Sequence, residues 1–351
     1  MSCYHPKHAM FRPGLRPNKK GEMTHGRPDI YPYSFHTEPC VDPFTGELLE
    51  EFTIPCGKCL GCFLDKSQQW ACRVVMESLD YVDNYFITLT YDEDHVPRNC
   101  KSKYFNRSQQ RWIDYATDDW MDVKTLSLED YQNFFKRLRI GLLRYFGQDD
   151  PIRYFGCGEY GSTTLRPHYH LCVCNLKLQD LVPLGVNRIG QTLYSSDFLS
   201  NTWGNGHIAV APLNFQTAAY TTRYCMKKAT GDPYQFIDAG MPDQFQTMSR
   251  RPGLGRFWYD THADSVWSSD KVVLPATSKD KAPTYRVPRY FDNILKREDP
   301  VRFAEVKKRR ELVKSLADGV RADQTDLDDL GYFELQERST AQRLTSLVRY
   351  L

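Results

Sequence analysis

Two histidines separated by one residue are the first candidates for chemistry in this chain. His168, Tyr169 and His170 open the segment HYHLCVC. Residues two apart in a β-strand point to the same side, so both imidazoles would leave one face of a sheet. Together they can ligate a divalent metal ion, and Glu159 could add a carboxylate while positions stay open for phosphate oxygens and water. The alternative interpretation is a pair of half-buried polar residues on a sheet surface.

A doubled tyrosine motif lies further along the chain, in the segment YTTRYCMKK. Tyr220 and Tyr224 are four residues apart, which places both phenols on one face of a helix. Each is followed three residues later by a base, Arg223 or Lys227. A phenol with a pKa of about 10 is a poor nucleophile at neutral pH, but nearby cations favour the phenolate and can neutralise an attacked phosphate. The alternative is an aromatic stripe that packs a core.

Three cysteines form the motif PCGKCLGC, which is typical of a metal clip. Cys56, Cys59 and Cys62 are spaced as C-x-x-C-x-x-C with small residues between them. A tetrahedral zinc ion would need one more ligand and would hold the N-terminal segment in place, which is a structural role. An iron–sulfur cluster and redox-active thiols are the alternatives. Three residues of the N-terminal segment could supply the fourth ligand: Cys3, His5 and Cys40.

A glycine motif between residues 156 and 161 matches G-x-G-x-x-G but lacks the context of a dinucleotide site. Such a site requires a helix to open at the third glycine, with its N-terminus facing a pyrophosphate. Here the chain continues through STTLRP into a strand, so the rim of a hairpin is the better interpretation. The sequence also contains no G-x-x-x-x-G-K-[ST] motif, so we expect no P-loop ATPase in this chain.

Composition narrows the class of protein. The 351 residues are 41% hydrophobic and 26% charged, enough for a real core in one large or two smaller domains. A mean hydropathy of -0.58 and the lack of a long apolar run argue against a membrane protein. The N-terminus lacks the layout of a secretory signal, so the 11 cysteines indicate metal-binding or free thiols in a reducing compartment. With a net charge of only +2, a polyanionic partner would have to bind local basic patches.

Five elements can be predicted around these motifs. Residues Tyr85–Tyr91 (YFITLTY) are typical of a buried strand, and Ser127–Phe146 of an amphipathic helix that begins at a capping-box serine and stops at a glycine. Ile152–Gly158 and His168–Val173 form a hairpin, and Asn214–Lys228 is a second amphipathic helix. This order predicts an α+β fold, with a ferredoxin-like or RRM-like antiparallel sheet and helices on one face.

The flanking regions are less regular. Residues 1–55 are rich in Pro, Gly and His, so regular structure is not expected there unless a metal staples the segment. Ser67–Leu79 can form a helix, residues 92–123 indicate an insertion or long loop, and the charged region after residue 299 has helical stretches such as Arg302–Leu316. The predicted parts are a Cys-rich zinc-binding segment with the first helix, a central domain, and a charged, largely helical extension: residues 1–80, 81–260 and 261–351.

The motifs together resemble the replication initiators of gokushoviruses, a branch of the microviruses, which are small single-stranded DNA phages. The resemblance spans most of the chain. It includes the opening CYHP and the segments CGKCLGC, SQQWACR, FITLTYDEDHVP, RYFGCGEYG, RPHYHLCV, YTTRYCMKK and SRRPGLGRFW. Such proteins are HUH endonucleases, with a His–hydrophobic–His metal site and a nucleophilic tyrosine helix. Here Tyr169 takes the middle position, and the tandem tyrosines are similar to the two-tyrosine version.

The resemblance implies rolling-circle replication. The protein would bind the viral origin, and one tyrosine would attack the scissile phosphate of an exposed single strand. This leaves a 5′-phosphotyrosine link and a free 3′-OH that primes the host polymerase. The second tyrosine then cleaves the regenerated origin, and the displaced strand is joined into a circle. No ATP is needed, so strand separation would fall to a host helicase, and the site of action would be the bacterial cytoplasm.

The resemblance also implies roles for individual residues. His168 and His170, with Glu159 as third ligand, would bind Mg²⁺ or Mn²⁺. Tyr220 and Tyr224 would alternate as nucleophiles. A third group would contact DNA, first through lysines at the scissile phosphate and then through a groove for the single strand: Lys227, Lys228, Arg223, Arg250, Arg251, Arg256 and Trp258.

Two other classes of function compete with this interpretation. Nucleotide hydrolases of the histidine-triad type carry His-x-His-x-His on a strand, but here the third position is Cys172 and the tyrosine helix would have no role. A non-catalytic zinc protein that binds nucleic acid would account for the cysteines and the basic residues, although not for the paired histidines.

Overall fold

The computed structural model describes most of the chain, and every statement below concerns those residues. The described residues are 3–10, 16–17, 21, 23–24, 28–32, 51–98, 103–106, 111–114, 124–161, 164–187, 190–224, 241–275 and 282–346. Within them the chain divides into two compact units, residues 66–318 and residues 1–65 with 319–348. This division differs from the three predicted parts, which stay a prediction. No helix in the described part is long and apolar enough to cross a membrane.

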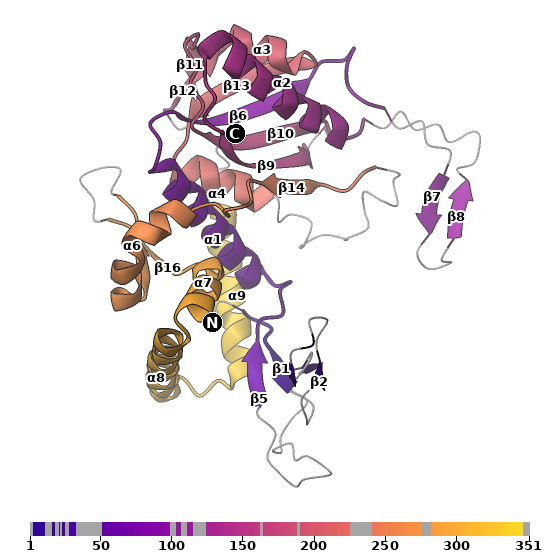
Figure 1. Ribbon diagram of the computed structural model, residues 1–351. Helices are drawn as coiled ribbons and strands as arrows, with labels where there is room; N and C mark the ends of the chain where they lie inside the picture. The colour runs from indigo at the N-terminus through magenta and orange to yellow at the C-terminus, as the bar shows by residue number, and fades with distance from the viewer. Residues whose placement is uncertain are drawn as a thin grey trace. The chain divides into compact units, whose positions relative to one another are not determined.

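The larger unit is built on a seven-stranded antiparallel sheet, which confirms the predicted α+β class (Figure 1). β6 lies near its centre and pairs with β10 on one side and β13 on the other. The strand order is β11-β12-β13-β6-β10-β9-β14. The bounds are Val182–Val186 (β11), Thr192–Ser195 (β12), Gly206–Pro212 (β13), Asn84–Tyr91 (β6), Pro167–Cys174 (β10), Arg153–Tyr160 (β9) and Phe245–Met248 (β14).

Four central strands and two helices form a repeating connection. The chain runs β6-α2-β9-β10-α3-β13, with α2 at Leu128–Phe146 and α3 at Asp197–Trp203. Because β9 and β6 both pair antiparallel with β10, they run parallel to each other with β10 between them. By the same argument β13 and β10 run parallel with β6 between them. Both crossovers therefore skip one strand.

Helix α2 matches the predicted helix at both ends. The side chain of Ser127 accepts a hydrogen bond from the Asp130 amide, and Gly147 ends the helix in the left-handed conformation with φ 62°. One face of the helix packs on the sheet beside α3. The core there is formed by aromatic and aliphatic residues of α2, β6 and β10, including Tyr131, Phe134, Leu138, Ile87, Leu89, Tyr169 and Leu171.

The opposite face of the sheet is also covered by helices, so the expectation of helices on one face is wrong. α1 (Leu60–Ser78) and α4 (Phe215–Tyr224) pack there, as Figure 1 shows for α4. Their small residues Ala71 and Ala218 contact strand residues such as Phe86, Phe155 and Cys172. The sheet alternation explains the error: β6, β9 and β10 carry buried side chains in both directions, and each face needs a cover. α1 begins earlier than predicted, directly after Cys59.

A second core in the larger unit is helical. It contains α6 (Arg256–Ser269), α7 (Arg289–Glu298) and α8 (Pro300–Gln324), with the short pair β15 (Lys271–Val273) and β16 (Thr284–Arg286). Buried aromatics hold it together, among them Trp258, Tyr259, Trp267 and Phe291. The predicted helix at Arg302–Leu316 lies inside α8.

The smaller unit contains regular structure where little was expected. β1 (Lys7–Met10) pairs with β4 (Asp29–Pro32) and β5 (Glu51–Ile54), and β2 (Arg16–Pro17) pairs with β3 (Met23–Thr24). Helix α9 (Asp329–Ser346) belongs to the same unit. Tyr4 Oη lies 2.8 Å from Thr340 Oγ1, and His5 Nε2 lies 2.6 Å from Glu337 Oε2. Composition missed these strands because their partners are distant in sequence.

The predicted insertion after β6 contains a small hairpin of β7 (Lys103–Asn106) and β8 (Arg111–Asp114). Its base is closed by an isolated antiparallel bridge between Arg98 and Lys124. The Thr125 amide also donates a hydrogen bond of 2.7 Å to the Pro97 carbonyl. The two ends of the insertion are thereby held together at the end of β6.

Candidate metal and tyrosine site

Strand β10 presents His168 and His170 on the face covered by α4. Tyr169 points to the other face, is fully buried, and donates a hydrogen bond of 2.8 Å to the Ser127 carbonyl at the start of α2. The phenol also lies 2.8 Å from Tyr91 Oη. The middle residue of the motif therefore anchors the strand in the core, and its alternation sends both imidazoles the other way.

Glu159 joins the histidines from the neighbouring strand. It lies directly opposite His168 in the β9–β10 pairing. Its Oε1 atom is 2.8 Å from His168 Nε2 and 3.2 Å from His170 Nε2. One ligand atom from each of the three residues lies within 4.8 Å of the others, so the group could hold a metal ion. The structure thus brings together the three predicted ligands.

The other ring nitrogens fix the orientation of both imidazoles. His168 Nδ1 lies 3.0 Å from the Arg166 carbonyl oxygen, which can only accept, so Nδ1 carries the proton and donates. His170 Nδ1 lies 3.0 Å from Thr88 Oγ1, on β6. Both Nε2 atoms are left facing Glu159. An imidazole held through Nδ1 and presenting Nε2 is the usual arrangement of a metal-ligating histidine.

The burial of Glu159 supports a cation at this place. Its side chain is 2% exposed, and burial alone would raise its pKa, but hydrogen bonds from His168 and His170 outweigh burial and lower the pKa below the usual range. Its Oε2 atom is buried with no hydrogen-bond partner among the described residues. A buried carboxylate oxygen of this kind needs a donor or a cation, and a divalent ion fits the mixed oxygen and nitrogen set.

Helix α4 places Tyr220 beside the histidines. The Tyr220 ring centroid lies 5.1 Å from that of His170 at 82°, and 6.1 Å from that of Phe86 at 90°. Phe86 also stacks on His170, with centroids 5.4 Å apart. Tyr220 is half-buried, so its ring is held edge-on against both neighbours.

Polar contacts hold α4 on the sheet and on α1. Asn214 and Thr217 form a reciprocal cap, in which Asn214 Oδ1 accepts from the Thr217 amide (3.0 Å) and Thr217 Oγ1 accepts from the Asn214 amide (2.9 Å). Thr221 Oγ1 lies 3.3 Å from Cys172 Sγ on β10. Thr222 Oγ1 lies 3.0 Å from Ser67 Oγ on α1. The predicted helix therefore has a fixed position under Tyr220.

Four predicted residues follow Tyr220 in the chain. The backbones of Arg223 and Tyr224 lie in the last turn of α4, so the helix does continue through the second tyrosine. Lys227 and Lys228 lie outside the described residues. The roles predicted for these four stay predictions.

The predicted DNA groove is only partly available. Trp258 is buried in the helical core and stacks on His262 with centroids 4.3 Å apart, so it is not free to stack on a base. Arg256 pairs with Asp260 (2.7 Å) in α6 and with Glu298 (3.0 Å) in α7. Periodicity could not separate a packing tryptophan from a stacking one. Arg250 and Arg251 are exposed beside β14 and remain candidates.

Four cysteines of the smaller unit form a second candidate metal group: Cys3, Cys56, Cys59 and Cys62. The Sγ atoms of Cys59 and Cys3 are 3.8 Å apart, and those of Cys56 and Cys62 are 3.9 Å apart. With metal–sulfur bonds of about 2.3 Å, sulfurs at the corners of a tetrahedron lie about 3.8 Å apart. The four thiols thus have the spacing of a tetrahedral site. Of the alternatives for the fourth ligand, His5 contacts Glu337 instead, and Cys40 lies outside the described residues.

Backbone amides prepare these sulfurs for a metal. Burial raises the pKa of Cys3 to about 11, whereas for Cys59 amide donors, including that of Tyr4 at 3.3 Å, outweigh burial and lower the pKa to about 7. The Cys56 amide donates to Cys3 Sγ at 3.2 Å, and the Cys59 amide donates to Cys56 Sγ at 3.3 Å. Amide donors of this kind stabilise thiolates, the form that binds metals.

The glycine motif has a packing role. Gly156 and Gly158 lie inside β9 on the face toward α2. A Cβ at Gly156 would come within 2.4 Å of the Tyr131 hydroxyl, and one at Gly158 within 2.9 Å of the Phe245 ring. The rejection of a dinucleotide site is consistent with this, since the motif continues into a strand and not a helix.

Sequence reasoning missed three residues that shape the site: Phe86, Thr88 and Arg166. The segment YFITLTY does place Phe86 and Thr88 on one strand face, but their contact with His170 depends on the β6–β10 register, in which Thr88 faces His170. Arg166 lies two residues before His168, and its backbone carbonyl, which carries no side-chain signal, orients that ring.

Comparison with known proteins gives the family of the chain. Residues 84–229, which include the paired histidines and the tandem tyrosines, match the family described as replication-associated protein ORF2. The chain is 28% identical over 287 residues to replication-associated protein VP4 of Bdellovibrio phage phiMH2K, covering 81% of each chain. It is 30% identical over 267 residues to replication-associated protein ORF2 of Spiroplasma virus 4, covering 74% of each.

A further relative is replication-associated protein ORF4 of Chlamydia phage 1, 26% identical over 256 residues, or 70% of this chain and 54% of the relative. The chain belongs to the family of phage replication-associated proteins, which confirms the predicted family. No solved structure matches the chain.

Proposed function

We propose that this protein initiates viral DNA replication as a rolling-circle endonuclease of the HUH class. It would nick one strand at the origin through a tyrosine and later rejoin the displaced strand into a circle. The observation that carries the proposal is the convergence of Glu159, His168 and His170 beside a helix-borne tyrosine, with the Tyr220 ring 5.1 Å from that of His170. The family of replication-associated proteins supports the same interpretation.

The fold supports this class. The order β6-α2-β9-β10-α3-β13, with strands arranged β13-β6-β10-β9, is a βαββαβ connection of the ferredoxin-like kind. We propose that this is the HUH core and that α4, on the opposite face, is the tyrosine helix. The two functional groups then come from the sheet and from a helix that is capped, packed and hydrogen-bonded onto it.

Glu159 and the Nε2 atoms of His168 and His170 would hold Mg²⁺ or Mn²⁺. Such an ion, when bound, polarises a phosphate and neutralises charge in the transition state. The chain's own residues set the geometry: the Arg166 carbonyl fixes the His168 ring, Thr88 contacts the His170 ring, and Phe86 braces both His170 and Tyr220. A preorganised site of this kind orients the scissile phosphate without further rearrangement.

The chemical step is a transesterification. The Tyr220 or Tyr224 oxygen bonds to phosphorus while the bond from phosphorus to the 3′ oxygen breaks. The phenol loses one proton and the 3′ oxygen gains one, so atoms and charge balance without ATP. Lys227, Lys228 and Arg223 would neutralise phosphates near the reacting bond. Arg250 and Arg251 would contact the DNA backbone further away.

The four-cysteine group would hold a structural zinc ion. Two sulfur–sulfur distances of 3.8 and 3.9 Å fit tetrahedral ligation, and amide donors favour thiolates. The other partners that we propose are host helicase and polymerase, because the sequence has no P-loop and a free 3′-OH needs extension. The host bacterial cytoplasm would be the place of action.

Covalent capture tests the proposal. The protein is incubated with Mn²⁺ and overlapping single-stranded oligonucleotides that tile the phage genome. We expect an adduct that survives boiling in SDS on at least one oligonucleotide, and its loss in the double variant Tyr220→Phe/Tyr224→Phe. Tyr145→Phe, an exposed tyrosine on α2, is the matched control and should keep the adduct. No adduct on any oligonucleotide would exclude the nicking mechanism, and a histidine-triad hydrolase or a non-catalytic zinc protein would give that result.

A further inference from the structure

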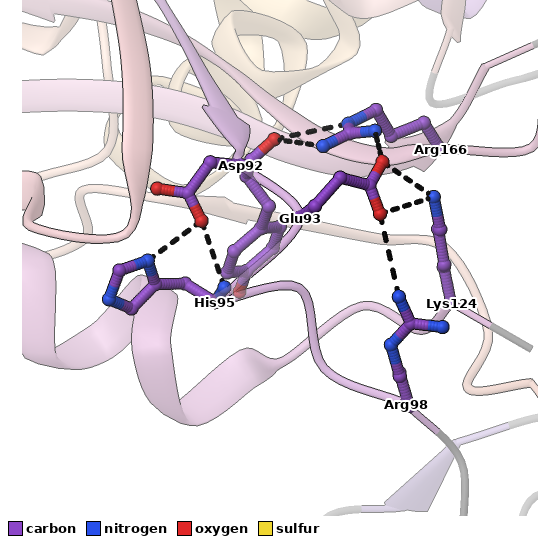
Figure 2. A network of polar contacts seen from close by, with 7 residues as sticks. Asp92, Glu93, His95, Arg98, Lys124 and Arg166 are labelled. Atoms are coloured by element: carbon purple, nitrogen blue, oxygen red, sulfur yellow. Dashed lines mark hydrogen bonds and ion pairs between the residues drawn. The ribbon is translucent and has the colours of Figure 1, made fainter.

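Three cations surround one exposed carboxylate at the end of β6. Lys124 Nζ lies 2.8 and 2.9 Å from the two carboxylate oxygens of Glu93. Arg166 Nη1 is 2.5 Å from Oε1, and Arg98 Nη2 is 3.4 Å from Oε2. Figure 2 shows the three side chains closing on Glu93 from different segments of the chain. We call Arg98, Lys124 and Arg166 the basic cluster.

The backbone holds the basic cluster in place before any ligand binds. Arg98 and Lys124 face each other in the bridge that closes the base of the insertion. Arg166 is tied to the end of β6, because its Nε and Nη2 atoms donate to the Tyr91 carbonyl at 3.0 and 2.6 Å. A site whose cations are held by backbone contacts loses little side-chain freedom on binding an anion.

The basic cluster lies next to the proposed metal site. His168 pairs with Thr90 across the β6–β10 ladder, and Tyr91 is the next residue of β6. The Arg166 carbonyl accepts the hydrogen bond from His168 Nδ1, while its guanidinium reaches Glu93. One residue therefore links the metal-ligating ring with the basic cluster.

The charges in this region leave an excess that suits a polyanion. The three cations and Glu93 together carry a net charge of +2. The neighbouring Asp92 carboxylate is turned to His95, with Oδ1 2.7 Å from Nδ1 and 2.8 Å from the His95 amide (Figure 2). The Glu93 side chain is 59% exposed, so solvent and ligands can reach it. Exposed ion pairs of this kind exchange readily with an incoming anion.

A phosphodiester can take the place of the Glu93 carboxylate. Both present two oxygens to the same donors, and arginine binds carboxylate and phosphate in the same forked manner. Hydrogen bonds from Lys124 and Arg166 lower the pKa of Glu93 to about 2, so it is an anion at every working pH.

We infer that the basic cluster binds a backbone phosphate of the DNA strand that enters the metal site, and that Glu93 occupies the place of this phosphate in the free protein. The inference rests on the proposed function, because it assigns a second contact to the same DNA strand. Glu93 is then an internal competitor, which keeps the cations apart from other anions until DNA displaces it.

The sign of one substitution tests the inference. Binding of a fluorescein-labelled dT20 strand is followed by fluorescence anisotropy with EDTA present, so that no cleavage is needed. Glu93→Gln removes the competitor, and we expect binding about threefold to tenfold tighter. Lys124→Ala and Arg98→Ala should each weaken binding about threefold to tenfold and reduce the salt slope by about 0.7, the value for one phosphate on a single strand.

Two matched controls separate release of the cluster from a general change of charge. Asp92→Asn removes the same charge one residue away without freeing a cation of the cluster. Asp264→Asn does so at an exposed pair with Arg302 between α6 and α8. Both should change dT20 affinity by less than about twofold. Thermal melting and circular dichroism check that each variant is folded.

Each result has one meaning. Tighter binding by Glu93→Gln alone supports the inference. Unchanged or weaker binding by folded Glu93→Gln, or an equal gain in Asp92→Asn, overturns it and leaves the basic cluster as an ion-pair network. The readout needs no adduct, so loss of the expected gain while the wild type still forms adducts refutes only this inference. A wild type that forms no adduct refutes the proposed function whatever the anisotropy shows.

Discussion

Removal of the metal from the four-cysteine group is expected to unfold the smaller unit and leave the larger unit intact. Among its described residues, the buried apolar side chains are few, and Met10 and Phe63 are the large ones. Burying two such side chains contributes about 3–6 kcal/mol. Ordering the 12 residues of β1, β4 and β5 costs at least about 12 kcal/mol of backbone entropy. A structural zinc contributes about 10–16 kcal/mol, which is enough to make the difference.

Hydrogen exchange with mass spectrometry measures this directly. We expect one zinc per chain in the wild type, and loss of that zinc in Cys59→Ser. Peptides from β1 and α9 should then lose protection by at least about a hundredfold, because α9 contacts Tyr4 and His5 beside the cluster. Peptides from β6 and β10 should keep their protection. A chelator added to the wild type should reproduce the same pattern.

Cys72→Ala is the matched control. Cys72 is equally buried but lies in the core of the larger unit, outside the cluster. It should keep the zinc and the protection of α9. A metal-free protein whose β1 and α9 peptides exchange as slowly as in the wild type would refute the reasoning, because packing alone would then hold this unit together.

Three further outcomes follow from the contacts of the larger unit. Glu77→Gln should destabilise the fold by about 3–5 kcal/mol in urea unfolding, since it breaks a buried pair with Arg153 (2.6 Å) and weakens the hydrogen bond that Glu77 accepts from the Gly255 amide; a cost below about 1 kcal/mol would contradict this. Trp258→Phe should lower the melting temperature but change dT20 affinity by less than about twofold, because the indole is buried; a large loss of affinity would restore its DNA role. The depressed pKa of Glu93 means that its contribution to stability is present above its ordinary pKa of 4.5 and is lost as the pH falls toward about 2; acid unfolding of Glu93→Gln should lack this dependence, and identical acid curves would count against it.

The local parts of the fold could be predicted because their signals are local. The alternation in HYHLCVC places Tyr169 in one core and both histidines on the other face. The Ser127 cap and Gly147 stop define α2 to within one residue. In each case, neighbours in sequence determine which side of an element is buried.

The remaining parts depend on contacts between distant segments. Whether a helix covers the second face of the sheet is decided by α1 and α4, whose small residues Ala71 and Ala218 fit against Phe155. Likewise, the sequence around Trp258 cannot reveal that His262 covers its ring. The basic cluster joins residues from three segments, and no spacing between 98, 124 and 166 indicates that they meet.

The smaller unit is assembled from both ends of the sequence, and this has a consequence for synthesis on the ribosome. Residues 1–65 emerge first, but α9, which belongs to the same unit, is translated last. The nascent N-terminal strands must therefore wait for most of the polypeptide without their helical partner. The four thiols, by contrast, are all available within the first 62 residues. Zinc captured at that stage would protect the waiting segment from aggregation, so zinc-starved expression should lower the yield of intact protein more than its specific activity.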